Sequence, residues 1–274
     1  MRCPNCGSEN EAKARYCASC GVSLPDEGQA RAAAGAAKAV TAEGLVFGKK
    51  AREARIREVV DPSLVISNTA YNGVIGAVLL WGLLINYLLC AKVTTISSIF
   101  PNMSPIVFGI VYLVLVAIGI GMTVKAQSPV ISFIGYNIVV IPFGIVISTL
   151  VQYYGGIDSA VVTQAFLYTL LIAVAMMATV IVFPKAFEKM GTALAVALGG
   201  LLLCEIIMLL FHVRQSWMSW IAAGLFSLYL GYDIYRSQEY PKTIKNAVAS
   251  ALDIYMDLAN LFIRLLEILG DSKD

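Results

Sequence analysis

Charged residues are scarce in this chain. Only 14% of its 274 residues are Asp, Glu, Lys or Arg, whereas 58% are hydrophobic. Since an average soluble domain has about 25% charged residues, the composition excludes an ordinary soluble domain. It predicts instead a helical protein that crosses the membrane several times. The formal net charge is only +2, and no nucleic-acid partner is expected.

Several functional patterns are missing as well. The sequence contains no nucleotide-binding loop, no Ser–His–Asp set and no haem-ligand pattern, and its single histidine is His212. We therefore do not expect an enzyme. No apolar signal-peptide region occurs before residue 69, so a cleaved signal peptide is not expected either.

Four of the six cysteines lie within the first 20 residues. Cys3, Cys6, Cys17 and Cys20 form the spacing C-x2-C-x10-C-x2-C, with a glycine after each pair. Four thiolates on two tight turns suit tetrahedral Zn²⁺, whereas two redox pairs are disfavoured because no βαβ pattern surrounds them. The spacing predicts a structural zinc ribbon over residues 1–24 that cannot fold without its metal.

Two short segments connect this ribbon to the first long hydrophobic stretch. Residues 25–44 are rich in Ala and Gly and are expected to form a linker. Residues 45–60 carry five basic side chains, which favour either a solvated charge cluster that sets topology or an amphipathic helix on anionic lipid. The domains expected are a zinc ribbon at 1–24, the linker and basic segment at 25–60, and a transmembrane domain at 61–274.

Seven hydrophobic stretches follow, and each is long enough to cross a bilayer as a helix. They cover residues 69–91, 105–124, 130–151, 160–183, 191–211, 217–235 and 246–269. We therefore expect an all-α fold with seven transmembrane helices in a lipid bilayer, and we expect this bilayer to be the plasma (inner) membrane of a prokaryote. Most basic residues outside the hydrophobic stretches fall in segments on the same side of the membrane as the N-terminus. Because basic loops are usually cytoplasmic, this bias predicts a cytoplasmic N-terminus, a cytosolic ribbon and a C-terminus outside.

The last stretch carries a polar stripe. Asp253, Asp257, Asn260, Arg264 and Glu267 are separated by four, three, four and three positions, and the residues between them are apolar. At about 100° per residue, the five fall on one face that is roughly 80° wide. A charge that faces lipid costs on the order of 3 kcal/mol. The stripe therefore predicts a central helix that the other helices surround.

The sixth stretch supplies another acid, Asp233, close to Arg236. Because the connection to the last helix is short, we expect Asp233 to approach Asp253 or Asp257. Two carboxylates in a medium of low dielectric cannot both ionise cheaply, so a shared proton would hold the two helices together. The alternative is that these acids only cap helices or pair with Arg236 and Arg264.

Glu205 lies deep in the fifth stretch, where a functional and a hydrogen-bonded structural role are equally plausible. An intramembrane aspartyl protease, in which two acids activate water, is disfavoured, because Asp257 lacks a G-x-G-D context and no P-A-L motif follows it.

The last two stretches contain the segments Ser227-Leu-Tyr-Leu-Gly-Tyr-Asp-Ile-Tyr-Arg236 and Leu252-Asp-Ile-Tyr-Met-Asp-Leu-Ala-Asn-Leu-Phe262. These two segments resemble the Bax-inhibitor-motif (TMBIM) family of membrane proteins. The resemblance covers about residues 60–270 and implies seven helices, six of them around the last. It also implies a pH-sensitive leak for Ca²⁺ in which Asp233 and Asp257 form the acid pair.

The chain departs from the family pattern at two places. Asp253 is an additional acid, and residues 106–124 contain no Lys or Arg where relatives have a basic residue that latches the pair. Arg236 and Arg264 are the candidates to replace this basic residue.

Two functions remain open. One is a calcium leak gated by Asp233 and Asp257. The other is a non-conducting regulator of membrane-protein quality control or stress response that docks a protein partner through the zinc ribbon.

Overall fold

The computed structural model describes residues 9, 55–56, 58–92, 104–211 and 217–271, with only the backbone at 105, 106 and 209. The expected zinc ribbon, the linker and most of the basic segment lie outside these residues. The chain divides into two units. The larger consists of Asn68–Tyr240 and Ile244–Asp274, and the smaller of Met1–Ser67 with Pro241–Thr243.

The described part of the smaller unit contains one turn of 3-10 helix, η1 (Pro62–Leu64). Asp61 caps this turn by accepting a hydrogen bond of 2.9 Å from the Ser63 N–H. The hydrogen bonds from Ser63 lower the pKa of this exposed carboxyl below its ordinary value. The Ile66 N–H donates to the Lys242 carbonyl at 2.8 Å, which joins the two pieces of chain that make up this unit.

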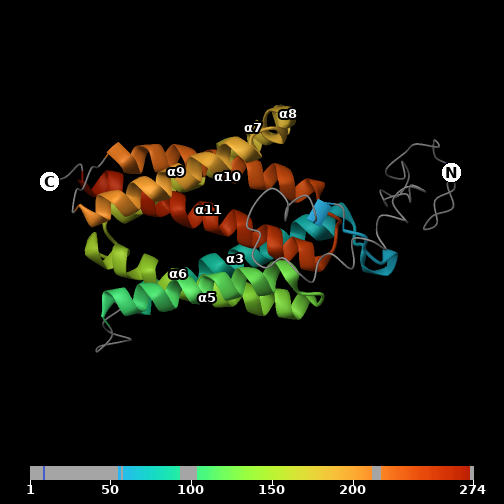
Figure 1. Ribbon diagram of the computed structural model, residues 1–274, viewed down its shortest axis with the longest axis horizontal. Helices are drawn as coiled ribbons and strands as arrows, with labels where there is room; N and C mark the ends of the chain where they lie inside the picture. The colour runs from blue at the N-terminus through green and yellow to red at the C-terminus, as the bar shows by residue number, and fades with distance from the viewer. Residues whose placement is uncertain (1–8, 10–54, 57, 93–103, 212–216, 272–274) are drawn as a thin grey trace. The chain divides into compact units, whose positions relative to one another are not determined.

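The larger unit is helical, and no strand occurs among the residues described. Its helices are α3 (Asn68–Lys92), α5 (Pro105–Lys125), α6 (Pro129–Tyr153), α7 (Ala160–Val182), α8 (Pro184–Glu188), α9 (Gly191–Leu210), α10 (Trp217–Glu239) and α11 (Ile244–Asp271) (Figure 1). The seven long helices coincide with the seven hydrophobic stretches, whereas the short α8 was not anticipated.

Five of the seven long helices have the length and apolar composition of a membrane span: α3, α5 from Val107 onward, α6, α7 and α9 up to Met208. The other two, α10 and α11, are the least apolar of the seven. The helices expected from the sequence are thus present, while the count of seven membrane spans stays a prediction.

Serine residues cap the start of three helices. The side chains of Ser104, Ser128 and Ser159 accept hydrogen bonds of 3.2–3.3 Å from backbone N–H groups in the first turns of α5, α6 and α7. Proline follows the cap of α5 and of α6, where its fixed φ suits the first helical position. These local signals explain why the helix starts agree closely with the sequence.

Helix α11 lies at the centre of the larger unit (Figure 1). It packs against α3, α5, α6, α7 and α10, and buried side chains occur around its whole circumference. Helix α9 packs chiefly on α10 instead. The last helix is therefore central, as the polar stripe predicts, while the arrangement of six helices around it stays a prediction from the resemblance.

The outer faces of the surrounding helices are apolar. Exposed large side chains include Leu80 on α3, Leu113 on α5, Ile181 on α7 and Val196 on α9. Apolar surface of this extent is unfavourable in water, whereas it is favourable against the hydrocarbon of a bilayer. Together with the five apolar helices, this surface identifies an integral membrane protein in a lipid environment.

Helices α5 and α6 meet at a pair of glycines. A Cβ added to Gly119 would lie 2.7 Å from the Gly135 carbonyl oxygen, and a Cβ added to Gly135 would lie 2.7 Å from the Gly119 carbonyl oxygen. Small residues let helix backbones approach each other closely in membranes. The absence of a side chain at both positions therefore determines how closely α5 and α6 pack.

We expect Gly119→Ala to destabilise the protein by roughly 1–3 kcal/mol, because the added methyl group would force α5 away from α6. Gly121→Ala is the matched control on the same helix, since a Cβ there would meet nothing within 4 Å. Thermal unfolding in detergent measures both effects. Equal losses of stability for the two variants would contradict the close approach at Gly119.

Candidate functional site

The two acids singled out by the sequence lie on helices that pack against each other. Asp233 is on α10, Asp257 is on α11, and each is only 6% exposed. Removing a carboxylate from water this far costs several kcal/mol unless charge pairing, hydrogen bonds or protonation compensate. Asp253, one turn before Asp257, is half-buried. The structure thus places all three acids in the α10–α11 pair.

Arg236 belongs to the same end of α10 as Asp233. Its guanidinium carbon lies 5.6 Å from the centre of the Tyr232 ring, within the range of a cation–π interaction. This contact keeps a positive charge on the helical turn that follows Asp233. Arg236 is therefore placed to influence the acid pair from α10.

The next member of the stripe, Asn260, is satisfied within its own helix. Its side-chain amide donates a hydrogen bond of 2.8 Å to the Met256 carbonyl. An amide that bonds back to the helix keeps a polar surface on the stripe without adding charge. Asn260 therefore separates the acids near the middle of α11 from the charged residues near its end.

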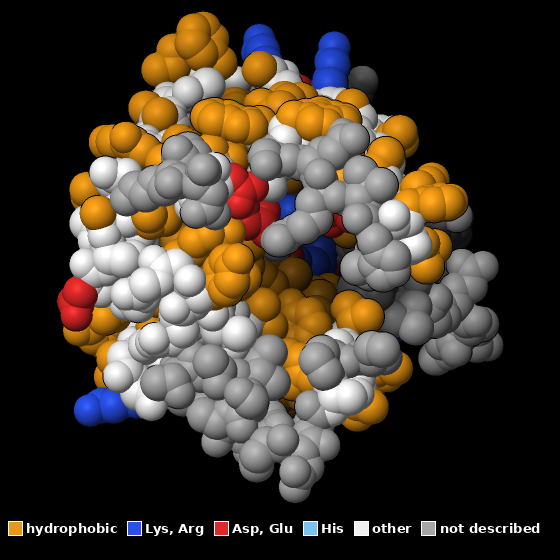
Figure 2. Space-filling model, turned by 90° about the vertical axis from the view of Figure 1, so that its left-hand side faces the viewer, with side chains coloured by type: hydrophobic (Ala, Val, Ile, Leu, Met, Phe, Trp, Pro, Cys, Tyr) orange, Lys and Arg blue, Asp and Glu red, His pale blue; other side chains and the backbone are white. Residues whose placement is uncertain are grey.

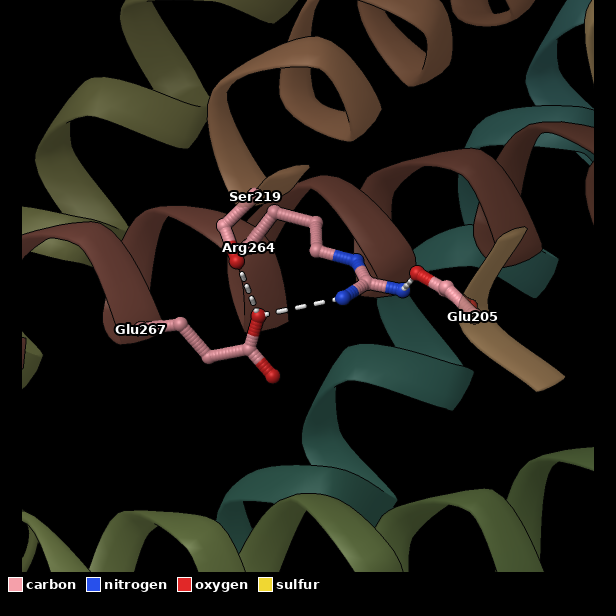
Figure 3. A network of polar contacts seen from close by, with 4 residues as sticks. All are labelled: Glu205, Ser219, Arg264 and Glu267. Atoms are coloured by element: carbon pink, nitrogen blue, oxygen red, sulfur yellow. Dashed lines mark hydrogen bonds and ion pairs between the residues drawn. The ribbon is translucent and has the colours of Figure 1, made fainter. Parts of the chain in front are cut away.

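Arg264 is the centre of a charged network near the end of α11 (Figure 3). Its guanidinium bonds to Glu205 of α9 and lies 3.1 Å from the Glu267 carboxylate of its own helix. The Ser219 hydroxyl of α10 donates to the same Glu267 oxygen at 2.8 Å. The network connects three helices, and its two carboxylates and one guanidinium carry a formal charge of −1.

The side chains of this network are partly accessible. Glu205 and Glu267 are each 28% exposed and Arg264 is 20% exposed. Figure 2 shows the end of the helix bundle at which α11 finishes, where acidic and basic side chains gather around a hollow near the middle of the face. Solvent-accessible charges are thus present at this end of the central helix.

Buried tyrosines form a second polar system that the sequence analysis missed. Tyr71, Tyr136 and Tyr255 are each 0% exposed. The Tyr136 hydroxyl donates to the Val78 carbonyl at 2.9 Å, and the Asn86 amide donates to the Tyr255 hydroxyl at 2.7 Å. A buried tyrosine normally needs a partner for its hydroxyl, so tyrosines inside apolar stretches are the signal that identifies these residues.

Tyr71 connects the first long helix to the α10–α11 pair. Its hydroxyl lies 3.0 Å from the Ser237 carbonyl of α10 and 3.1 Å from the Ser250 hydroxyl of α11. The helical donor for the Ser237 carbonyl would be residue 241, but Pro241 has no N–H. Tyr71 therefore donates to a carbonyl whose usual helical donor is missing, one turn beyond Asp233.

We expect Tyr71→Phe to lower the free energy of unfolding by about 1–3 kcal/mol, because the buried Ser237 carbonyl then loses this donor. Tyr87→Phe is the matched control on the same helix, since Tyr87 is 58% exposed; its effect should stay within about 0.5 kcal/mol. Chemical unfolding in mixed micelles compares the two. A loss for Tyr71→Phe no larger than that of the control would contradict the role assigned to the hydroxyl.

The described part of the chain contains no cluster of metal-binding side chains. In residues 58–92, 104–211 and 217–271, no three His, Cys, Asp or Glu side chains are grouped so that they could hold a metal ion. The four cysteines predicted to bind zinc lie outside this part. Neither the zinc prediction nor the passage of calcium is tested by this observation.

Comparison with known proteins divides the chain in the same way as the sequence. Residues 1–25 match a domain of unknown function (DUF7577), which gives no support to a zinc ribbon. No curated protein matches the chain. Residues 68–274 match the family described as Inhibitor of apoptosis-promoting Bax1 (Bax1-I), in agreement with the resemblance of the last two helices. The match covers most of the chain, which therefore belongs to the Bax inhibitor family.

Proposed function

We propose that this protein is a pH-sensitive leak for cations, calcium in particular, and that Asp233 and Asp257 gate it. The observation that carries the proposal is the position of these two acids. Each is 6% exposed, and they lie on packed helices, one of which is the centre of an integral membrane protein. Ionisable residues at such positions are typically functional.

The proposed path follows the polar stripe of α11. Carboxylate oxygens are the ligands that a hard cation such as Ca²⁺ prefers, and Asp253 and Asp257 are one turn apart on this stripe. When Asp233 and Asp257 share a proton, α10 and α11 are held together and the path is narrow. When both are charged, they repel each other across a gap of low dielectric, where repulsion is stronger than in water.

Ion flux across proteoliposomes tests this function. The full-length protein is reconstituted, and calcium uptake is followed with an enclosed indicator at several pH values. We expect uptake above that of protein-free vesicles, with a rate that changes with pH. Uptake equal to that of protein-free vesicles at every pH would refute the leak.

The proposal includes an orientation. The distribution of basic residues at the ends of the helices favours an N-terminus in the cytoplasm and a C-terminus outside. The membrane proposed is the inner membrane of a prokaryote. In this arrangement the α10–α11 connection is cytoplasmic, and the Arg264 network lies toward the outside.

A second candidate function is a non-conducting regulator that docks a partner through its N-terminal module. It is favoured by the separate match of residues 1–25, which lies outside the Bax inhibitor match. Deletion of residues 1–24 distinguishes the two functions. If the protein is a regulator, this deletion should abolish its effect in cells and leave calcium uptake by vesicles unchanged. If it is a simple leak, the deletion should leave its effect in cells intact.

The zinc proposal has its own test. Four cysteines in C-x2-C pairs should bind one Zn²⁺ per chain, and elemental analysis of the purified protein measures it. The variant Cys3→Ser/Cys6→Ser should lose the metal, whereas Cys204→Ser, which removes an exposed single cysteine, should keep it. Less than about half an equivalent after reconstitution with zinc would refute the prediction.

A further inference from the structure

Arg264 connects the central helix, α11, to α9, the long helix that packs least against it. Helix α9 packs chiefly on α10, but its Glu205 bonds to Arg264 of α11, 59 positions later in the chain. Because Arg264 and Glu205 are 20% and 28% exposed, water weakens their ion pair relative to a fully buried one, so the pair can open. While it is closed, the pair attaches α9 to α11 at this level.

Arg264 also lies on the polar stripe itself. It follows Asp257 by seven positions, which is about 10 Å along the helix at 1.5 Å per residue, and on the same face. A cation that moves along the stripe from Asp257 toward the end of α11 must pass the guanidinium. A fixed positive charge there opposes the passage of a cation.

The guanidinium is held from two sides. Glu205 binds it from α9, and Glu267 lies 3.1 Å away on the next turn of α11, supported by Ser219 of α10. If the bond to Glu205 breaks, Glu267 can still neutralise the guanidinium. Glu267 already contacts the guanidinium in the same arrangement, so Arg264 stays paired on its own helix when Glu205 lets go.

The surroundings agree with a gate rather than a buried structural pair. The three charged side chains are 20–28% exposed, and acidic and basic side chains are visible near the middle of the face at this end of the bundle (Figure 2). The excess of one carboxylate attracts cations to the same place. A cation can therefore approach the Arg264 side chain near the end of α11.

We propose that Arg264 is a second gate of the cation path, at the C-terminal end of α11, and that Glu205 of α9 holds it closed. This inference rests on the proposed leak function. Release of Glu205 leaves the guanidinium held by Glu267 on its own helix and lets α9 move away from α11, which opens this end of the stripe. The gate is separate from the acid pair, which lies about two turns away.

Calcium uptake at one fixed pH tests the gate in proteoliposomes of the full-length protein. We expect Glu205→Gln and Arg264→Gln each to raise the initial rate about threefold or more, since the interaction that closes the gate is lost. The exchanged pair Glu205→Arg/Arg264→Glu restores the interaction and should return the rate to within about twofold of the original. Glu239→Gln, at an exposed position of α10, is the control and should have no effect.

A merely structural ion pair gives a different pattern, in which the single variants lose stability and do not conduct faster. Unchanged or lower rates in both single variants would overturn the gate while leaving the leak intact. Rates in the exchanged variant as high as in the single variants would also overturn it.

Hydrogen exchange in lipid nanodiscs gives a readout that does not depend on flux. Glu205→Gln should speed the exchange of the α9 amides but not of the α6 amides, because only α9 loses its attachment. If the original protein takes up no calcium, the leak function fails and the gate fails with it. Faster exchange of α9 would then show that the pair is only an attachment of this helix.

Discussion

Asp233→Asn and Asp257→Asn are each expected to flatten the pH dependence of calcium uptake, because an amide cannot titrate. Both acids are almost completely buried in packed helices. If they share one proton, removing either carboxylate removes the same titration. The double variant should therefore resemble each single variant, and the effects should not add. Uptake by proteoliposomes across a range of pH values measures all three.

Asp253→Asn serves as the comparison within the same helix. Asp253 is half-buried rather than buried, and the resemblance implies that it is an additional acid outside the pair. We expect this variant to keep most of the pH dependence. A steep pH dependence that survives in the double variant Asp233→Asn/Asp257→Asn would refute the pair as the sensor and would direct attention to Glu205 and Asp253.

The central position of α11 could be predicted from the sequence because the pattern is local. Charged and polar residues at helical spacing within an apolar stretch leave one physical solution, which is to turn the stripe away from lipid. The helix boundaries could be predicted for the same reason, since serine caps and prolines determine them within a few residues. Local patterns such as these are therefore enough to predict the helices and which of them is central.

The partners of the polar side chains could not be predicted. From the sequence, several acids could have paired with Arg264. Only the packing of α9 against α10 brings Glu205 close to the guanidinium. The hydroxyl of Tyr255 meets Asn86, a residue 169 positions earlier. Such contacts depend on the relative rotation and displacement of helices, which the apolar pattern of each helix does not determine.

These polar contacts occur along the whole length of α11. Near its start, Ser250 meets Tyr71; at its middle, Tyr255 meets Asn86; and near its end, Arg264 meets Glu205. Apolar helices gain no hydrophobic free energy by associating with each other in lipid, so packing and interhelical polar contacts must hold them together. The three contacts attach α11 to α3 twice and to α9 once, which is how a polar helix remains at the centre.

The middle contact should matter most for stability. Tyr255 is 0% exposed, and its ring centre lies 5.9 Å from that of Tyr136 and 6.1 Å from that of Phe143, both at edge-to-face angles. Removing this ring leaves a cavity at the point where α3, α6 and α11 meet. We expect Tyr255→Ala to cost about 3–5 kcal/mol, the range for large-to-small changes of a buried aromatic residue.

Tyr255→Phe isolates the hydroxyl from the ring. It should cost about 1–2 kcal/mol, because the buried Asn86 amide then loses the acceptor that lies 2.7 Å away. Replacing both partners removes that penalty, so Tyr255→Phe/Asn86→Leu should cost less than the sum of the two single variants. Tyr153→Phe, at a position that is 73% exposed, is the control and should change little. Unfolding in mixed micelles measures the whole cycle, and strictly additive losses would show that the Asn86–Tyr255 hydrogen bond contributes nothing to the stability of the central helix.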